Sequence, residues 1–380
     1  MRPVRSVENA DALAKTIRQL RSHLAWLPAT ITSIVALLLL LSGQFSVNAQ
    51  DKPLRIGVLA LGPRYVPAWH CGEADHRSGS DEPKQDSTPY YVQGLVQQLT
   101  KLNYIEEQPG NARQSGRHFV LTFRTGTSQQ LREFAREFVV DRVDIIVAVA
   151  AAAVQIAQQE TQDHPTPILM TGVSDPVKNG FVQSLARPGG YITGVSHQVV
   201  QGSGRRVELF KEILPHLKHM LTIRLPGYAP SEQSLEEVRE TANRLKIEIS
   251  DRTTESRKDI RDVMAGIDSD SVDGIMILPD SHVIANLDLV IEASLSKRIP
   301  VFGIFDYMAG WGAVAADGPS AYEAGARLAS YVDSINTGTR PADLAIEPLD
   351  PKLVINLKAA QCVGMEVPFK VLSQADQVIR

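Results

Sequence analysis

The chain has 380 residues, of which 43% are hydrophobic and 22% are charged, and its formal net charge is -4. This composition is typical of a soluble globular protein, and a length above the usual size of one domain favours two lobes. Because there is no basic excess, we expect no nucleic acid partner.

The first 50 residues have the pattern of an export signal. Lys15, Arg18 and Arg21 precede a mostly apolar run over 31–41, and the small residue Ala49 marks a cleavage site. A basic segment, a short apolar core and a small residue at the cut are typical of a secretory signal, whereas a membrane-spanning helix needs about 20 apolar residues. We therefore expect residues 1–49 to be a signal peptide cleaved near Ala49, with an uncleaved anchor as the alternative.

In the first half of the remaining chain, short apolar segments alternate with segments of helical periodicity. This alternation is typical of a parallel sheet covered by helices. Thr127 and Gln130 form a capping box that predicts the start of a helix. The expected strands are 54–61, 118–126, 143–150 and 165–174, and the expected helices are 90–104, 128–142 and 151–160.

The second half repeats the same alternation, which predicts a second α/β lobe of similar build. A further helix is expected over 320–338, before the C-terminal segment. The expected strands are 219–227, 246–250, 272–280 and 299–305, and the expected helices are 204–217, 231–245, 257–267 and 286–298.

The phrase TGVS occurs twice, at 171–174 and at 193–196. Thr and Val favour extended backbone and Gly permits a bend, so the phrase suits both a strand end and a hinge. We expect the first copy to end a strand of lobe one and the second to lead the chain into lobe two. Chance recurrence of four common residues is the alternative.

Two cysteines, Cys71 and Cys362, are not enough for a disulfide framework. Cys362 has apolar neighbours and is interpreted as a buried small hydrophobic residue, with a bond to Cys71 as the alternative.

The run PILMTGVSDPVKNGFVQSLARPGGYITGVS (167–196) and the C-terminal LVINLKAAQCVGMEVP (353–368) resemble the ABC transporter substrate-binding family of the tryptophan/tyrosine type. The resemblance covers nearly the whole mature chain. It implies a type I periplasmic binding fold, in which two Rossmann-like lobes are joined by three crossovers and a hinge closes them on a small ligand. It also implies a periplasmic location and the membrane subunits of an ABC importer as partners. Lobe one is then 50–196 plus about 310–345, and lobe two is 197–309 plus about 346–380.

In open α/β sheets, ligands bind outside the carboxyl ends of the strands, so residues at the predicted strand ends are the candidate ligand contacts. The helix that follows Val149 could hold a carboxylate through its first N–H groups, and Asp175 could receive an ammonium group. Asp before Pro also caps turns, so both roles stay open for Asp175. The ligand-binding candidates are Leu61, Gly62, Ala150, Ala151, Ala152, Ser174, Asp175, Tyr228, Asp280, Ser281, Phe305, Asp306 and Asp317.

The sequence departs from the family pattern at two turns and in one segment. AVAAAAV at 148–154 lacks the hydroxyl that members often carry there, and AADGPS at 315–320 replaces a common SYGPD, which puts amino-acid recognition in doubt. The polar segment Val66 to Pro89 is longer than the usual loop and carries His70 and Cys71 among its potential metal ligands. Their spacing matches no standard zinc site, so a lid is the favoured interpretation, and we expect no metal.

No Gly-x-Ser-x-Gly elbow, His-Glu-x-x-His pair or phosphate-binding loop occurs, so we expect neither an enzyme nor a cofactor. The sequence favours a monomeric solute-binding component of an ABC importer that captures a small molecule, such as an amino acid or another small carboxylate. The alternative is an accessory protein of the same fold that reports a ligand to a membrane receptor.

Overall fold

The computed structural model describes residues 52–61, 89–107 and 116–380. The expected signal peptide lies outside the described residues, as does the polar segment up to residue 88 with its lid and metal interpretations. Across the described ranges, no helix combines the length and apolarity needed to span a membrane. Over the same part of the chain, His, Cys, Asp and Glu side chains form no group of three or more suited to a metal ion.

The first lobe is built on a seven-stranded sheet with the order β12-β6-β5-β4-β1-β3-β2, in which all paired strands are parallel. Helices α3 (Tyr90–Lys101) and α12 (Ala321–Asn336) pack on one face, and α4 (Ser128–Val140) and α5 (Ala151–Glu160) pack on the other. The strands are β1 Leu54–Leu61, β2 Tyr104–Glu106, β3 Arg117–Gly126, β4 Ile145–Val149, β5 Ile168–Val173, β6 Ile192–Ser196 and β12 Glu347–Pro348.

The second lobe contains another seven-stranded sheet, with the order β14-β13-β11-β10-β9-β7-β8, in which β13 runs antiparallel to β11. Its strands are β7 His219–Arg224, β8 Glu248–Thr253, β9 Gly274–Met276, β10 Val301–Gly303, β11 Ala315–Pro319, β13 Pro351–Asn356 and β14 Gln377–Ile379. After β6, the helical segments other than α12 are α6 Ser203–Ile213, α7 Ala229–Leu245, α8 Arg257–Ala265, α9 Ser281–Ala285, α10 Leu287–Ser296, α11 Asp306–Gly310, η2 Pro341–Asp343, α13 Leu357–Cys362 and α14 Phe369–Leu372.

The two sheets share one connectivity. The strands β3-β1-β4-β5-β6 and β8-β7-β9-β10-β11 each follow the order 2-1-3-4-5 of a doubly wound sheet. In this order the chain reverses direction across the sheet between β1 and β4, and again between β7 and β9. In sheets of this kind, ligands bind outside the carboxyl ends of the strands, near the reversal point, so each lobe is expected to meet a ligand at its carboxyl edge.

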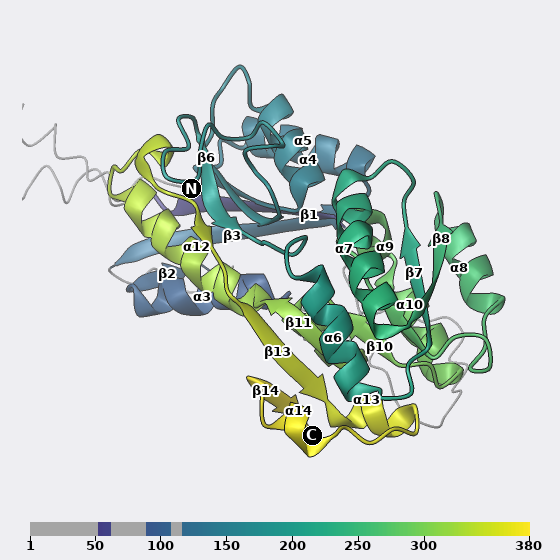
Figure 1. The fold of residues 1–380 in the computed structure, drawn as a ribbon. Coiled ribbons are helices and arrows are strands. Elements are labelled where there is room, and N and C mark those ends of the chain that lie inside the picture. The colour runs from purple at the N-terminus through teal and green to yellow at the C-terminus, as the bar shows by residue number, and fades with distance from the viewer. Residues whose placement is uncertain (1–51, 62–88, 108–115) are drawn as a thin grey trace, which may run out of the picture. The chain divides into compact units, whose positions relative to one another are not determined.

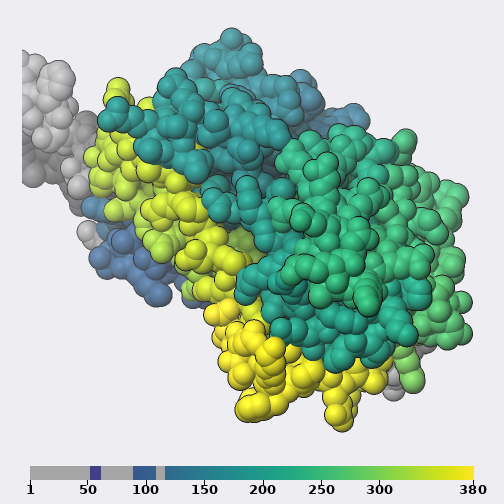
Figure 2. All heavy atoms as spheres, viewed as in Figure 1, coloured from purple at the N-terminus to yellow at the C-terminus, as the bar shows by residue number. Residues whose placement is uncertain are grey.

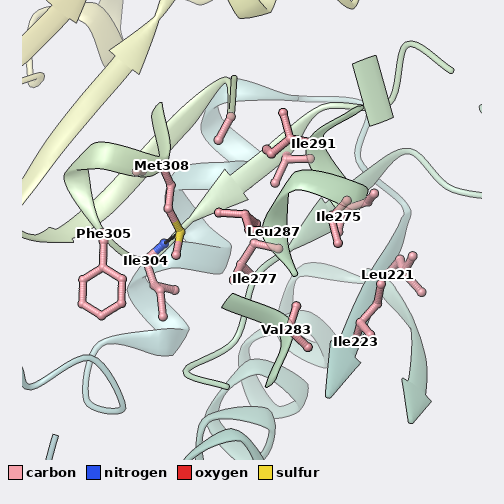
Figure 3. Close-up of a cluster of buried hydrophobic side chains, with 14 of the residues drawn as sticks. Leu221, Ile223, Ile275, Ile277, Val283, Leu287, Ile291, Ile304, Phe305 and Met308 are labelled. Carbon is pink, nitrogen blue, oxygen red and sulfur yellow. Dashed lines mark hydrogen bonds between the residues drawn. The ribbon is translucent and has the colours of Figure 1, made fainter. Parts of the chain in front are cut away.

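Buried aliphatic side chains hold each sheet to its helices. Figure 3 shows one such cluster, in which Leu221 and Ile275 of the second sheet face Leu287 and Ile291 of α10. Burying an aliphatic side chain of this size contributes about 1.5–3 kcal/mol to folding, so the cluster is a major source of stability for the second lobe. Phe305, at the carboxyl end of β10, lies at the edge of this cluster (Figure 3).

The chain passes between the lobes three times, over 197–202, at Ser320 and over 349–350. Lobe one was expected to resume at about residue 310, but β11 pairs with β10 and β13 and therefore belongs to the second sheet up to Pro319. In the same way, Glu347–Pro348 pairs with β6 and belongs to the first sheet. Figure 2 shows the residues from α12 to the C-terminus, yellow-green to yellow, as a band that continues from the first lobe onto the second.

The two TGVS copies lie on the neighbouring strands β5 and β6. The pairing register shifts between Met170 and Val173, and both Gly172 (φ 71°) and Gly194 (φ 134°) have backbone angles that favour glycine. A Cβ atom at Gly194 would collide with the backbone of Met170. The glycines thus allow two strands to bend together just before the first crossing.

Helices α3 and α12 lie side by side (Figure 1). A Cβ atom at Gly325 would collide with the carbonyl group of Tyr91, and one at Gly94 would collide with that of Tyr322. These glycines therefore permit a close helix contact directly after the second crossing, at the cost of about 0.5–1 kcal/mol per helical glycine.

The interpretation of Cys362 as an unpaired buried residue is wrong, because Cys362 is disulfide-bonded and only half-buried. The sequence holds one other cysteine, Cys71, which lies outside the described residues.

Candidate ligand-binding site

The carboxyl ends of the two sheets meet where β6 and β10 end. The ring of His197, directly after β6, contacts the ring of Phe305, two residues after β10, with centroids 5.6 Å apart and an edge-on angle of 61°. The backbone N–H of His197 donates to the carbonyl oxygen of Val173, which fixes the start of the first crossing against β5. This is the position at which a two-lobed binding protein is expected to hold its ligand.

Aromatic side chains extend from this contact. Phe305 stacks on Tyr307 with centroids 5.5 Å apart at 10°, and Tyr307 meets Trp311 at 4.7 Å. Burial and the neighbouring Tyr307 together raise the pKa of Tyr91, on α3 of the first lobe, well above its usual range. The row of aromatic rings in the second lobe therefore reaches the first lobe at His197, where Phe305 itself is buried.

His197 is the most unusual polar side chain at this edge. It is 4% exposed, its Nε2 atom lies 3.0 Å from the hydroxyl oxygen of Thr171, and its Nδ1 atom is buried without a hydrogen-bond partner. Burial lowers its pKa to about 4, so the ring is neutral at pH 7. An unsatisfied buried polar atom costs about 1–3 kcal/mol. Sequence analysis missed His197, although its position directly after the second TGVS copy, where the chain was expected to lead into lobe two, was a usable signal.

The predicted carboxylate site is the start of α5. Its N-cap residue, Ala150, has φ 77° and ψ 153°, and no side chain caps the helix there. That backbone region is essentially restricted to glycine, and such strain costs about 1–3 kcal/mol. The first N–H groups of a helix have no partner within it and attract anions. Ala151 and Ala152, which begin α5, are half-buried and add no competing side-chain acceptor.

Asp175 lies two residues after β5 and is exposed, while Ser174 before it is half-buried. The Asp175 Oδ1 atom accepts the backbone N–H of Lys178 at 2.9 Å, and the Asp175 carbonyl oxygen accepts from the side chain of Asn179. The carboxylate thus caps the following turn, one of the two roles that the sequence left open.

In the second lobe, Asp280 is fully buried and serves the backbone. Its Oδ1 atom accepts the N–H groups of His282 and Val283 at the start of α9, and its Oδ2 atom accepts the N–H of Leu225 after β7 at 2.8 Å. The candidates Tyr228 and Ser281 join each other through their hydroxyl groups at 2.8 Å. Asp280 thereby holds together the two loops that carry these hydroxyls.

Asp306 and Asp317 are likewise engaged. The Oδ1 atom of Asp306 accepts the N–H of Tyr307 and the N–H of Ala321, the first residue of α12. Asp317 is 2% exposed and accepts two hydrogen bonds from Arg205, at 2.8 and 2.9 Å. Burial raises the pKa of Asp317, and the charges of Arg205 and Arg206 oppose this rise.

Arg206 ties the first crossing to β11. Its buried guanidinium donates to the carbonyl oxygens of Asp317 at 2.8 Å and Val199 at 2.6 Å. Burial lowers the pKa of Arg206 to about 10, so it keeps its charge at pH 7. Asp317 therefore helps to hold the first crossing in place, through its contact with Arg206.

Two remaining candidates lie at the end of β1: Leu61 is its last residue, with a side chain that is not described, and Gly62 lies outside the described residues. A shallow hollow elsewhere is lined by Leu357, Ala360 and Met365 among others. Because β13 is antiparallel to β11 and leads into α13, this hollow is at the opposite edge of the sheet from the candidate contacts.

Comparison with known proteins agrees with this geometry. Residues 115–379 match the family model of the ABC transporter substrate binding protein. The tyrosine-binding protein of Clostridioides difficile (strain R20291) is 21% identical over 307 residues, which cover 78% of this chain and 88% of that protein. A conserved domain protein from Vibrio cholerae is 26% identical with a TM-score of 0.66, and it covers 86% of this chain and 100% of its own. An ABC domain in complex with L-Trp from Streptococcus pneumonia is 22% identical with a TM-score of 0.64 and the same coverage.

The two lobes and their three crossings define the type I periplasmic binding fold, which confirms the expected fold class. The chain belongs to the ABC transporter substrate-binding protein family, as the family model covers most of its length. The matched family and the curated relative are solute-binding proteins and not enzymes.

Proposed function

We propose that this protein is the solute-capturing component of an ABC importer and that it holds a small molecule with a carboxylate, such as an aromatic amino acid, where the two carboxyl edges meet. In this proposal the protein is an exported monomer, cleaved near Ala49, and its ligand-bound form docks on the membrane subunits. The observation that carries the proposal is the contact of His197 in the first lobe with Phe305 in the second, together with the uncapped start of α5. Thr171 connects the two, because its carbonyl oxygen accepts the Ala150 N–H and its hydroxyl meets His197.

The start of α5 supplies the carboxylate contact in this proposal. The N–H groups of Ala151 and Ala152 would donate to the carboxylate, as expected of uncapped helix N-termini, and Ser174 would lie beside it. The ammonium group would meet Asp175 or Asp306, and the apolar part would pack on Phe305. The names of two relatives, a tyrosine-binding protein and an L-Trp complex, support an aromatic amino acid as the first ligand to test.

The hinge gives the proposal its mechanism. A ligand favours the closed form only if it contacts both lobes, and the importer can then recognise that form. Because the three crossings lie beside one another, with Ser196 paired to Pro348 and Pro319 paired to Pro351, a small change at that point moves one whole lobe relative to the other.

Thermal unfolding with a panel of amino acids that includes L-tyrosine and L-tryptophan tests the proposal. A ligand that binds only the native state at 100 times its Kd adds about 2.7 kcal/mol to stability, so a true ligand raises Tm in a saturable manner. If no carboxylate of the panel raises Tm, the proposal fails.

A pair of variants locates the carboxylate. Ala152→Asp places a fixed negative charge at the start of α5, where it stabilises the helix by about 0.3–1 kcal/mol and competes with the ligand. We expect the carboxylate ligand to bind at least about tenfold more weakly, which is equivalent to about 1.4 kcal/mol of binding free energy. The Tm of the free protein should not fall. Ala152→Asn, similar in size but uncharged, is the matched control and should bind far better than the Asp variant.

A further inference from the structure

One ring nitrogen of His197, Nδ1, has no hydrogen-bond partner among the described residues. Nε2 meets the Thr171 hydroxyl at 3.0 Å, whereas Nδ1 is buried with no partner. The great majority of buried polar side-chain atoms are hydrogen-bonded, and an exception needs a specific reason. A purely structural histidine at this place would need only the Thr171 contact, which a smaller amide or hydroxyl could also make.

The surroundings of the ring are uncharged. Burial lowers its pKa to about 4, and its contacts with the Thr171 hydroxyl and the Phe305 ring bring no charge to the imidazole. A neutral imidazole has one donor and one acceptor nitrogen, and the orientation of the Thr171 hydroxyl decides which role is left to Nδ1. An ionised ligand group placed against this ring would be buried without a counter-charge, which is unfavourable.

The position of the ring links Nδ1 to the hinge. His197 is the first residue of the first crossing, and the ring that covers it, Phe305, belongs to the second lobe. Separation of the lobes would draw Phe305 away from His197 and open the edge of the imidazole to the space between the lobes.

We propose that His197 is a specificity-determining residue of this protein, whose Nδ1 atom hydrogen-bonds an uncharged polar group of the captured molecule, such as a hydroxyl, an indole N–H or an amide, beneath the ring of Phe305. The inference rests on the proposed solute capture and adds to it the residue that reads a neutral polar group, separate from the carboxylate site at α5. The ligand would thereby supply the partner that Nδ1 lacks and would contact both lobes at one point.

Two substitutions separate the nitrogens of the ring. His197→Gln keeps a polar atom near the Nε2 position, where it can still meet Thr171, and removes the one at Nδ1. His197→Asn keeps a polar atom near the Nδ1 position and gives up the Thr171 contact. Thr171→Val is the matched control, because it removes the Thr171 hydrogen bond and leaves the imidazole in place.

Calorimetric titration of the purified full chain with L-tyrosine and L-tryptophan as probes gives the test, together with the Tm of each free variant. We expect His197→Gln to weaken binding about tenfold or more, since a buried hydrogen bond is lost, and His197→Asn and Thr171→Val to stay within about threefold of the unsubstituted protein. The opposite order, with Gln tolerated and Asn not, would assign His197 a purely structural role and overturn the inference.

A measurement on the unsubstituted protein covers the case in which a variant fails to fold. The 15N resonance of His197 Nδ1 should shift when a probe saturates the protein, and the Nδ1 shift should persist in Thr171→Val. If a probe binds but the Nδ1 resonance and the variant affinities do not change, the inference fails while the proposed function stands. If neither probe binds the unsubstituted protein, the aromatic amino acid proposal fails and this inference fails with it.

Discussion

The carboxyl edges of the two sheets have the same connectivity but differ in how their acidic residues and helix starts are used. In the second lobe, the acidic residues Asp280 and Asp317 are buried and saturated by backbone N–H groups or by arginine. In the first lobe, the start of α5 has no side-chain cap, and His197 carries an unpartnered nitrogen. The acidic residues of the second edge are therefore used within the lobe itself, although Thr254 Oγ1 and His282 Nε2 there are buried without a partner. The first edge differs in presenting an uncapped helix start.

The acidic residues at the two edges show that a position near a strand end does not establish contact with a ligand. Four aspartates are candidate ligand contacts, three of them at the ends of predicted strands, yet Asp175 and Asp280 cap helices or turns, Asp306 anchors α12 and Asp317 holds Arg205. A carboxylate at a strand end serves orphan N–H groups as readily as it serves a ligand. Their direct roles in ligand binding therefore stay predictions, and the comparison can be tested at four positions.

The largest effect is expected at Asp280. Asp280→Ala leaves the buried N–H groups of Leu225, His282 and Val283 without an acceptor and should lower the free energy of unfolding by about 3–5 kcal/mol. Urea unfolding measures the loss, and hydrogen exchange should place it in β7 and β9 and not in the first sheet. Asp280→Asn keeps one oxygen acceptor and should lose clearly less; equal losses would contradict this account.

The next effect depends on pH and tests His197. The folded pKa of about 4 lies below the ordinary value near 6.5, so the unfolded chain takes up a proton first as pH falls. The stability that comes from burying His197 in its neutral form is complete above about pH 6.5 and falls as the pH drops toward 4. At pH 4 the loss amounts to about 3 kcal/mol. Urea unfolding across this range should show a smaller decline for His197→Gln than for the unsubstituted protein. Parallel curves would show that His197 is not buried in its neutral form.

A stabilising effect is expected at Ala150. Its φ of 77° and ψ of 153° are strained for alanine and natural for glycine, so Ala150→Gly should raise the free energy of unfolding by about 1 kcal/mol after the entropic cost of glycine. Thermal and urea unfolding check the gain. Ala152→Gly, within the helix, is the control and should destabilise; a loss in both would mean that the turn before α5 is not strained.

The smallest effect is expected at Asp175. Asp175→Ala removes an exposed turn cap on the N–H of Lys178 and should cost about 0.5–1 kcal/mol. Asp175→Asn can still accept that N–H and should restore most of the stability. Ligand affinity in the two variants separates the two roles of the carboxylate: a loss shared by Ala and Asn would assign it to an ammonium group, and unchanged affinity would restrict it to the turn.

Local patterns predicted much of the fold. The capping box of Thr127 and Gln130 is confirmed, with the Thr127 N–H donating to Gln130 Oε1 at 2.9 Å. The alternation of strand and helix holds along both lobes, and the expected family is confirmed. These features depend on neighbours within a few residues, so they can be read from a linear string.

Other features escaped the sequence because they depend on distant partners. The pairing of β11 with β13, the disulfide bond of Cys362 and the meeting of His197 with Phe305 each join residues that are far apart along the chain. The same reason explains the acidic candidates: position at a strand end was predictable, but the N–H group or arginine that each carboxylate meets was not.

The sequence by itself determined the class of fold, the order of its elements and the family, because hydrophobic periodicity and short motifs act locally. Only the tertiary structure decided which polar atoms are satisfied and which are left over. That balance is set by burial and by partners brought together across the two sheets, and it separates the aspartates that support the lobes from the histidine at their junction.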